Sequence, residues 1–153
     1  MSEKRKNQSH TPHGQLGQAF YFTRDDLAAN RAGYMTLSQQ FGFKFWERKA
    51  YRWLFDIPPF KWILGKRRNS VKIIGTIKKH YHSKVIFTGS GGSGGGHQEV
   101  LEQHRIQVLA PDQVVTFYVR ERQYSAIPDN TELTVYYDPM EQRILSVELP
   151  YDS

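Results

Sequence analysis

Cysteine is absent from this chain of 153 residues, so it forms no disulfide, no thiolate metal site and no cysteine nucleophile. The absence fits a reducing compartment. Long apolar runs are also missing, and without 18 consecutive apolar residues we expect no simple membrane-spanning helix. The first 19 residues are polar and lack the apolar centre of a signal peptide. We therefore expect a cytoplasmic location.

The common signatures of enzymes are missing as well. The sequence contains no Gly-x-Ser-x-Gly, no His-Glu-x-x-His and no nucleotide-binding glycine pattern. Glu99, Glu102 and Glu121 are better explained as solvent-facing charges of strands than as catalytic carboxylates. We therefore expect neither an enzyme nor a bound cofactor.

A run of glycine and serine occupies residues 89–96. No Lys-Ser or Lys-Thr and no helix start follows it, so it is not a phosphate-binding loop. An engineered linker and a natural low-complexity loop both explain its composition. In either case it predicts a flexible connection between two strands.

Positive charge is concentrated in one half of the chain, whose net charge is +6. Residues 1–70 hold 13 Lys and Arg against 5 Asp and Glu, which gives +8. Residues 71–153 hold 8 against 10, which gives −2. A localised basic region attracts polyanions such as nucleic acid or anionic lipid.

Two helices are predicted in the basic half. Thr23 is suited to cap a helix over about residues 24–32, and Gly33 is suited to end it. A second helix is predicted from about residue 37 to residue 56, capped by Thr36 or Ser38, because apolar residues recur there at helical spacing.

From residue 70 onward, apolar and polar residues alternate in the manner of strands. The predicted strands cover about residues 71–87, 99–109, 114–124, 132–137 and 143–149. The first is expected to be half-buried along its length, with Gly75 at a bend or bulge. Closing five short strands into a barrel would remove their exposed edges. The predicted fold is α+β, with two N-terminal helices and a five-stranded antiparallel OB-like or SH3-like β-barrel.

Composition divides the chain into three parts. Residues 1–19 are predicted to be a flexible basic arm, because they hold too few apolar residues to order alone. Residues 20–68 form a helical segment rich in aromatic and basic residues. Residues 69–153 form the small β-barrel, with the Gly/Ser linker at 89–96.

Several short motifs resemble those of a family of uncharacterised bacterial membrane-associated proteins with a small C-terminal β-barrel. The motifs are Asp25 to Gly33, Ser38-Gln39-Gln40, Gly75-Thr76-Ile77, Phe117-Tyr118-Val119, Leu133 to Pro139 and Ile144 to Glu148. The resemblance implies an OB/SH3-like barrel and no activity. The pair of membrane helices that the family has between Gln40 and Val71 is absent, and only an aromatic and basic segment stands there.

That segment, residues 41–68, provides the first candidate site. Its candidate binding residues are Lys44, Trp46, Arg48, Lys49, Arg52, Trp53, Trp62, Lys66, Arg67 and Arg68. Helices with this composition bind lipid interfaces, with aromatic residues in the membrane and cations near the headgroups. The alternative is that the aromatic stripe packs on the barrel and the cations face water. The first hypothesis is a binding or scaffolding module at an anionic surface, or on a membrane protein, at the inner face of the membrane.

Single-stranded nucleic acid is the alternative partner. The same cations would contact phosphates and the same aromatic rings would stack on bases. One face of the first strand would add a second basic surface, made of Lys78, His80, His82 and Lys84. The simpler interpretation is a solvated strand face. The sequence leaves the oligomeric state open.

The histidines are also candidate metal ligands. His80 and His82 point the same way on a strand, and His97 or His104 would complete three zinc ligands. Lys78 and Lys84 flank the pair, however, and positive neighbours disfavour a cation. We therefore expect no metal site.

Overall fold

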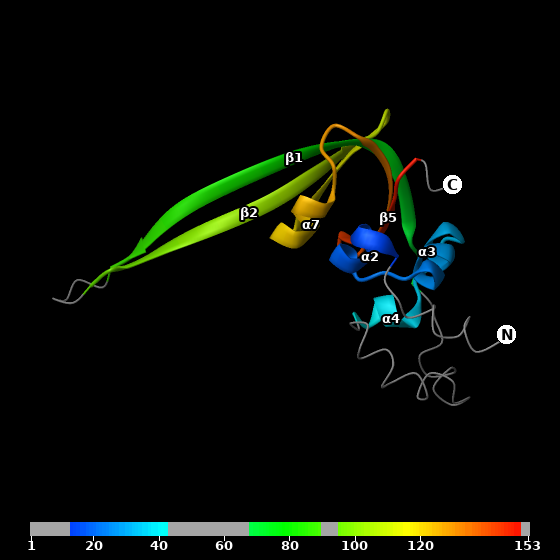
Figure 1. Cartoon of the computed structure of the whole chain (residues 1–153), viewed down its shortest axis with the longest axis horizontal. Coiled ribbons are helices and arrows are strands. Elements are labelled where there is room, and N and C mark those ends of the chain that lie inside the picture. The colour runs from blue at the N-terminus through cyan, green and yellow to red at the C-terminus, as the bar shows by residue number, and fades with distance from the viewer. Residues whose placement is uncertain (1–12, 43–67, 90–94, 151–153) are drawn as a thin grey trace.

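The computed structural model describes residues 13–42, 68–89 and 95–150. A five-stranded antiparallel sheet and several short helices make up this part of the chain (Figure 1). Hydrogen-bonded strands follow the order β3-β2-β1-β4-β5. Their bounds are β1 Val71–Thr88, β2 His97–Leu109, β3 Val114–Val119, β4 Glu132–Asp138 and β5 Arg143–Glu148. The α+β class and the five antiparallel strands are therefore confirmed.

Two details of the sheet differ from the prediction. The third strand ends at Val119, because helix α7 (Glu121–Ala126) occupies the rest of the predicted range. The Gln123 side chain accepts a hydrogen bond from the backbone N–H of Arg120 at 2.9 Å, which fixes the start of this helix. Strands β3 and β5 are the two edges of the sheet, and among the described residues no strand pairing joins them. The sheet is thus open rather than closed into a barrel.

Helix α3 (Arg24–Arg31) begins and ends where the sequence predicts. The hydroxyl of Thr23 accepts from the backbone N–H of Asp26 at 3.2 Å, and the Asp26 carboxylate accepts from the N–H of Thr23 at 2.8 Å. This reciprocal pair is a capping box. Gly33 follows with φ +91°, a conformation that favours glycine.

Helix α4 (Leu37–Gln40) confirms only the start of the second predicted helix. Thr36 caps it, but the helix ends after one turn and Gly42 takes φ +69°. The prediction of a continuous helix is therefore wrong at this point, because a left-handed residue stops it. The remainder of that prediction, residues 43–56, lies outside the described residues.

Helix α2 (Gly14–Phe20) lies within the range predicted as a flexible arm. Ala19, Phe20 and Phe22 are buried in the core, and the N–H of His13 donates to the carbonyl of Phe22 at 3.1 Å. These apolar anchors order a segment whose own composition is polar. Residues 1–12 of the predicted arm lie outside the described residues.

One face of the sheet forms the core with α2 and α7. Ile77, Ile106 and Val108 are fully buried there. Gly75 lies at a close approach, because a Cβ on it would stand 2.5 Å from the carbonyl oxygen of Leu109. The pairing of β1 with β4 runs through Gly75 without a register shift and the pairing with β2 begins at Thr76, so of the predicted bend or bulge the structure shows no bulge. The glycine allows two backbones to meet instead.

The β1–β2 hairpin extends well beyond its neighbours (Figure 1). Its ladder runs from Thr76–Leu109 to Thr88–His97, whereas β4 pairs with β1 only as far as Thr76 and β3 pairs with β2 only as far as His104. We name residues 81–88 and 97–103 the arm. Tyr81, Val85 and Phe87 are exposed there, so the prediction of a strand half-buried along its whole length is wrong.

Candidate polyanion-binding face

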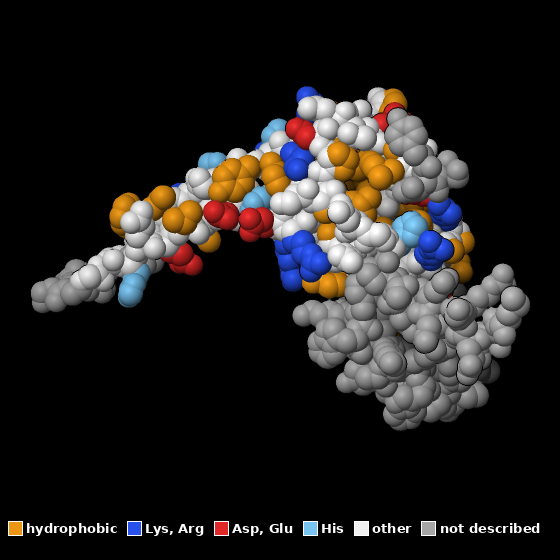
Figure 2. Space-filling view, in the orientation of Figure 1, with side chains coloured by type: hydrophobic (Ala, Val, Ile, Leu, Met, Phe, Trp, Pro, Cys, Tyr) orange, Lys and Arg blue, Asp and Glu red, His pale blue; other side chains and the backbone are white. Residues whose placement is uncertain are grey.

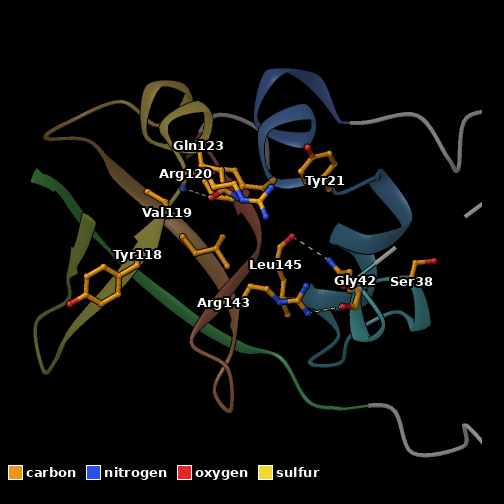
Figure 3. A pocket seen from close by; sticks show the side chains of 12 residues that line it. Tyr21, Ser38, Gly42, Tyr118, Val119, Arg120, Gln123, Arg143 and Leu145 are labelled. Carbon is orange, nitrogen blue, oxygen red and sulfur yellow. Dashed lines mark hydrogen bonds between the residues drawn. The ribbon is translucent and has the colours of Figure 1, made fainter. Parts of the chain in front are cut away.

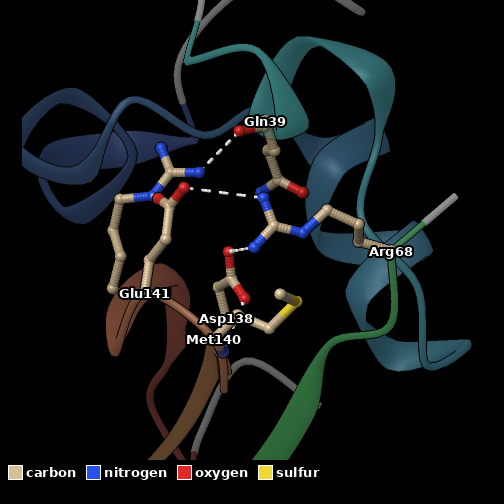
Figure 4. A network of polar contacts seen from close by, with 6 residues as sticks. Gln39, Arg68, Asp138, Met140 and Glu141 are labelled. Carbon is tan, nitrogen blue, oxygen red and sulfur yellow. Dashed lines mark hydrogen bonds and ion pairs between the residues drawn. The ribbon is translucent and has the colours of Figure 1, made fainter. Parts of the chain in front are cut away.

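Nine of the ten residues predicted in segment 41–68 lie outside the described residues, and only Arg68 is described. Arg68 Nη2 lies 2.8 Å from Asp138 Oδ2, and its Nη1 lies 3.5 Å from Glu141 Oε1 (Figure 4). The Asp138 side chain is 1% exposed, and its other oxygen accepts the N–H of Met140 at 3.0 Å. Arg68 therefore pairs within the protein and is not displayed to a partner.

The second predicted site lies on the face of the sheet opposite the core. Lys78, His80, His82 and Lys84 are all exposed and alternate with inward residues along β1. His80 Nε2 lies 2.9 Å from Oε1 of Gln107 on the neighbouring strand. The structure thus places these four residues in a row, as the alternation predicts.

Two residues that the sequence does not single out complete this face. Arg105 of β2 stands opposite His80 on one side and opposite Tyr118 of β3 on the other. The Tyr118 side chain is 66% exposed. Each strand step spans about 4.8 Å, so one row crosses three strands and combines an imidazole, a guanidinium and a phenol ring. The signal is available only through the strand register, which composition does not supply.

We name this surface the outer face, and it comprises Lys78, His80, His82, Lys84, Arg105 and Tyr118. The strand register puts two carboxylates on the same side. Glu99 lies toward the end of the arm, opposite Ile86, and Glu132 lies opposite Thr76. Glu132 thus stands between Lys78 and Lys72, a further exposed cation on this side of β1, and Glu99 lies beyond Lys84.

The inner face of the arm has a different chemistry (Figure 2). Hydrophobic side chains are exposed there, with Val85 opposite Val100 and with Phe87 76% exposed. At the base of the arm, the His104 ring lies between Tyr81 and Tyr124, with centroid distances of 5.1 and 4.9 Å. These rings connect the arm to α7.

Two polar groups near the base of the arm have partners within the protein. Lys79 Nζ donates to the carbonyl of Ile127 at 3.0 Å and lies 4.3 Å from the centre of the Tyr124 ring. The Tyr81 hydroxyl donates to Glu102 at 3.1 Å, and this hydrogen bond raises the pKa of Tyr81. Lys79 is therefore not part of the basic surface, although it neighbours Lys78 in sequence.

The histidines considered as zinc ligands are not brought together. His80 and His82 lie on the outer face, whereas His104 lies on the inner face between two tyrosines. His97 is six residues along β2 from the partner of His82, a distance of roughly 20 Å. Across the described ranges, no three metal-ligating side chains lie together.

A cleft of about 450 Å³ opens where β3 and β5 face each other, with α2 and α4 beside it (Figure 3). Arg120 and Gln123 line its α7 side, and Arg143 faces them from β5. Arg143 Nη2 donates to the carbonyl of Gln39 at 2.7 Å, so its position is fixed. The described lining offers guanidinium and amide groups for an anion, but no nucleophile paired with a base.

The cleft continues the outer face around the edge of the sheet, because Tyr118 belongs to both. Among the described residues, the Arg120 guanidinium has no carboxylate partner. The sequence could not indicate this cleft, since β3 and β5 are distant along the chain and approach only in the folded sheet.

An ion pair between the half-exposed Arg31 and the largely buried Glu148 ties α3 to the last strand. The guanidinium of Arg31 pairs with Glu148, and the Tyr136 hydroxyl donates to the same carboxylate at 3.2 Å. Burial favours the neutral form of Glu148, but the bonds from Arg31 and Tyr136 outweigh it and hold the pKa of Glu148 below its ordinary value. Burial raises the pKa of Tyr136. This cluster is structural, and its members lie on α3, β4 and β5, which carry none of the six outer-face residues.

Comparisons with known proteins give no identification: no family model, no curated protein and no solved structure matches the chain. The resemblance to membrane-associated bacterial proteins therefore stays a prediction. Within the described ranges, no helix has the length and apolar character needed to cross a bilayer.

Proposed function

We propose that the protein is a non-enzymatic binding module whose outer face binds single-stranded nucleic acid. The observation that carries the proposal is the row across β1, β2 and β3, in which the guanidinium of Arg105 lies between His80 and the exposed ring of Tyr118. Lysine and arginine neutralise phosphates, and an exposed ring offers a stacking platform for a base.

The strand arrangement supports this choice of surface. OB-like barrels are partly open five-stranded folds that bind oligonucleotides on strands 2 and 3 and with the loop between strands 1 and 2. In this chain, strands 2 and 3 carry Arg105 and Tyr118, and the hairpin of strands 1 and 2 is the arm. An OB-like identity is part of the proposal.

Titration of a fluorescent oligothymidylate with the full chain, at two salt concentrations, tests the proposal. Arg105→Ala should weaken binding and reduce the salt slope by about 1, because one phosphate contact is lost. Tyr118→Ala should weaken binding by about 1–3 kcal/mol at either salt concentration, because stacking carries no counterion release. Arg122→Ala is the matched control, since it removes an exposed cation from α7 outside the outer face. Full affinity in the Arg105 and Tyr118 variants would remove the outer face as the site.

An anionic membrane surface, or a membrane protein at the inner face of the membrane, is the second candidate, and the distribution of charge favours it. The described residues hold 11 Lys and Arg against 11 Asp and Glu, so the whole excess of +6 lies in the remaining residues. Segment 41–68 contributes most of it, together with three tryptophans. Sedimentation with anionic vesicles at low salt distinguishes the candidates, because vesicle binding without oligonucleotide binding would favour the membrane.

A further inference from the structure

The outer edge of β2 is open along the arm. Strand β3 pairs with β2 only between His104 and Leu109, so residues 98–103 have no strand beside them on that side among the described residues. Exposed edges in proteins commonly carry charged residues, above all lysine, or a proline or a bulge, and these features hinder pairing with another chain. Residues 98–103 contain neither lysine nor proline, and their pairing with β1 is regular.

We infer that two copies of this chain join along this edge and form a four-stranded antiparallel sheet from their two arms. An isolated two-stranded hairpin is marginally stable in water, and three or more strands are needed for independent stability. A second arm supplies the missing neighbours. The inference does not depend on the proposed function, because the outer face stays exposed in such a pair.

The exposed apolar pair Val85 and Val100 favours a second copy as the partner, and the charges on the edge restrict its register. Glu99 and Glu102 are the only formal charges on residues 98–103, so the edge repels a polyanion. In a two-fold pair whose axis is perpendicular to the sheet, opposed residues share a face. Registers centred on Glu99 or Glu102 would place two carboxylates opposite each other, which is destabilising.

The register centred on Val100 avoids this repulsion. Val100 then stands opposite the partner's Val100, Glu99 stands opposite the partner's Leu101, and Gln98 stands opposite the partner's Glu102. On the inner face, Val85 and Val100 of both copies would form one apolar row across four strands, since Val85 is already paired with Val100. Cross-strand pairs of β-branched residues are favourable. The Val100 side chain, 52% exposed in the single chain, would gain a neighbour.

The absence of cysteine allows a direct test. Directly opposed residues of antiparallel strands have Cα atoms about 4.5–5.5 Å apart, which is within the range of a disulfide. Val100→Cys should therefore form a covalent dimer on mild oxidation. Gln103→Cys is the matched control, because two such residues would lie six positions apart, roughly 20 Å, and cannot bridge. Leu101→Cys reports the neighbouring register, centred on Leu101, because only there would the two cysteines stand directly opposite each other.

The mass of the uncrosslinked chain in solution completes the test. The unaltered chain should sediment as a dimer at high concentration, and Val100→Lys should raise its dissociation constant at least about tenfold by placing two lysines opposite each other. Circular dichroism should stay unchanged, because Val100 is on the surface. A monomeric mass at every concentration, or equal crosslinking of the Val100→Cys and Gln103→Cys variants, would overturn the inference. Stronger crosslinking of the Leu101→Cys variant would overturn the register.

Discussion

Ile77 and Phe87 lie on the same strand and on the same face, yet Ile77 is fully buried and Phe87 is 76% exposed. The difference arises from what lies above each residue. Helix α7 and the neighbouring strands cover the base of the β1–β2 hairpin, and this cover ends near Tyr124. Alternation therefore decides which way a side chain points, whereas burial is decided by the elements packed on that face.

Truncating one large side chain in the core and one on the arm should produce the largest difference in the free energy of unfolding. Phe22→Ala should destabilise the fold by about 3–5 kcal/mol, because Phe22 is fully buried in the core below the hairpin. Phe87→Ala should change stability by less than about 0.5 kcal/mol, because its ring lies in water. Urea denaturation measures both values, and equal losses would show that the arm is part of the cooperative core.

Adding a methyl group at Gly75 should cause the next largest loss of stability. Gly75→Ala would place a Cβ against the backbone of Leu109 and Ala110, and backbone cannot rotate away as a side chain can. We expect a loss of about 1–3 kcal/mol. Gly89→Ala is the control, because a Cβ there meets nothing within 4 Å. A neutral result at Gly75 would mean that the two strands separate easily at the base of the arm.

The ion pair between Arg31 and Glu148 predicts a pH dependence of stability that arises outside the arm. The pKa of Glu148 is lowered on folding, so its contribution is present above the unfolded value of about 4.3 and is lost as pH falls through the folded value. Glu148→Gln should flatten the stability curve in that acidic range, by less than about 1 kcal/mol because Arg31 is half-exposed. Thermal melts from about pH 3 to pH 7 measure it. An unchanged curve would assign the acid response to other carboxylates.

The smallest effect concerns local opening rather than global stability. Amides of the arm should exchange with solvent faster than those of the ladder between Thr76 and Lys79, because the arm has few buried contacts. Hydrogen exchange measured at several protein concentrations also tests the proposed dimer. Protection of residues 98–103 should increase with protein concentration, and a constant exchange rate would speak against pairing of the arms.

Local signals predict much of this fold and little of its surface. The cap at Thr23 and the turn at Asp138 depend on residues a few positions apart, so the sequence shows them directly. Helix α7 escapes prediction because its six residues are too few to show a helical period, and its N-cap, Arg120, is not one of the residues that usually cap helices. Arg105 and Tyr118 need the strand register, and the cleft at Arg120 needs the approach of β3 to β5. Contacts between distant segments leave no local pattern.

Gly42 and Arg68 both lie near the residues that join β4 to β5. Gly42 lies beside the guanidinium of Arg143, and Arg68 binds Asp138 and Glu141 in the same turn. Residues 43–67 therefore leave and rejoin the fold at one anchored point, and the length of chain between two fixed ends has a weak effect on closure entropy. Replacing residues 43–67 with a short linker would change the closure entropy little, and vesicle binding lost with oligonucleotide binding kept would assign the two candidate partners to separate parts of one molecule.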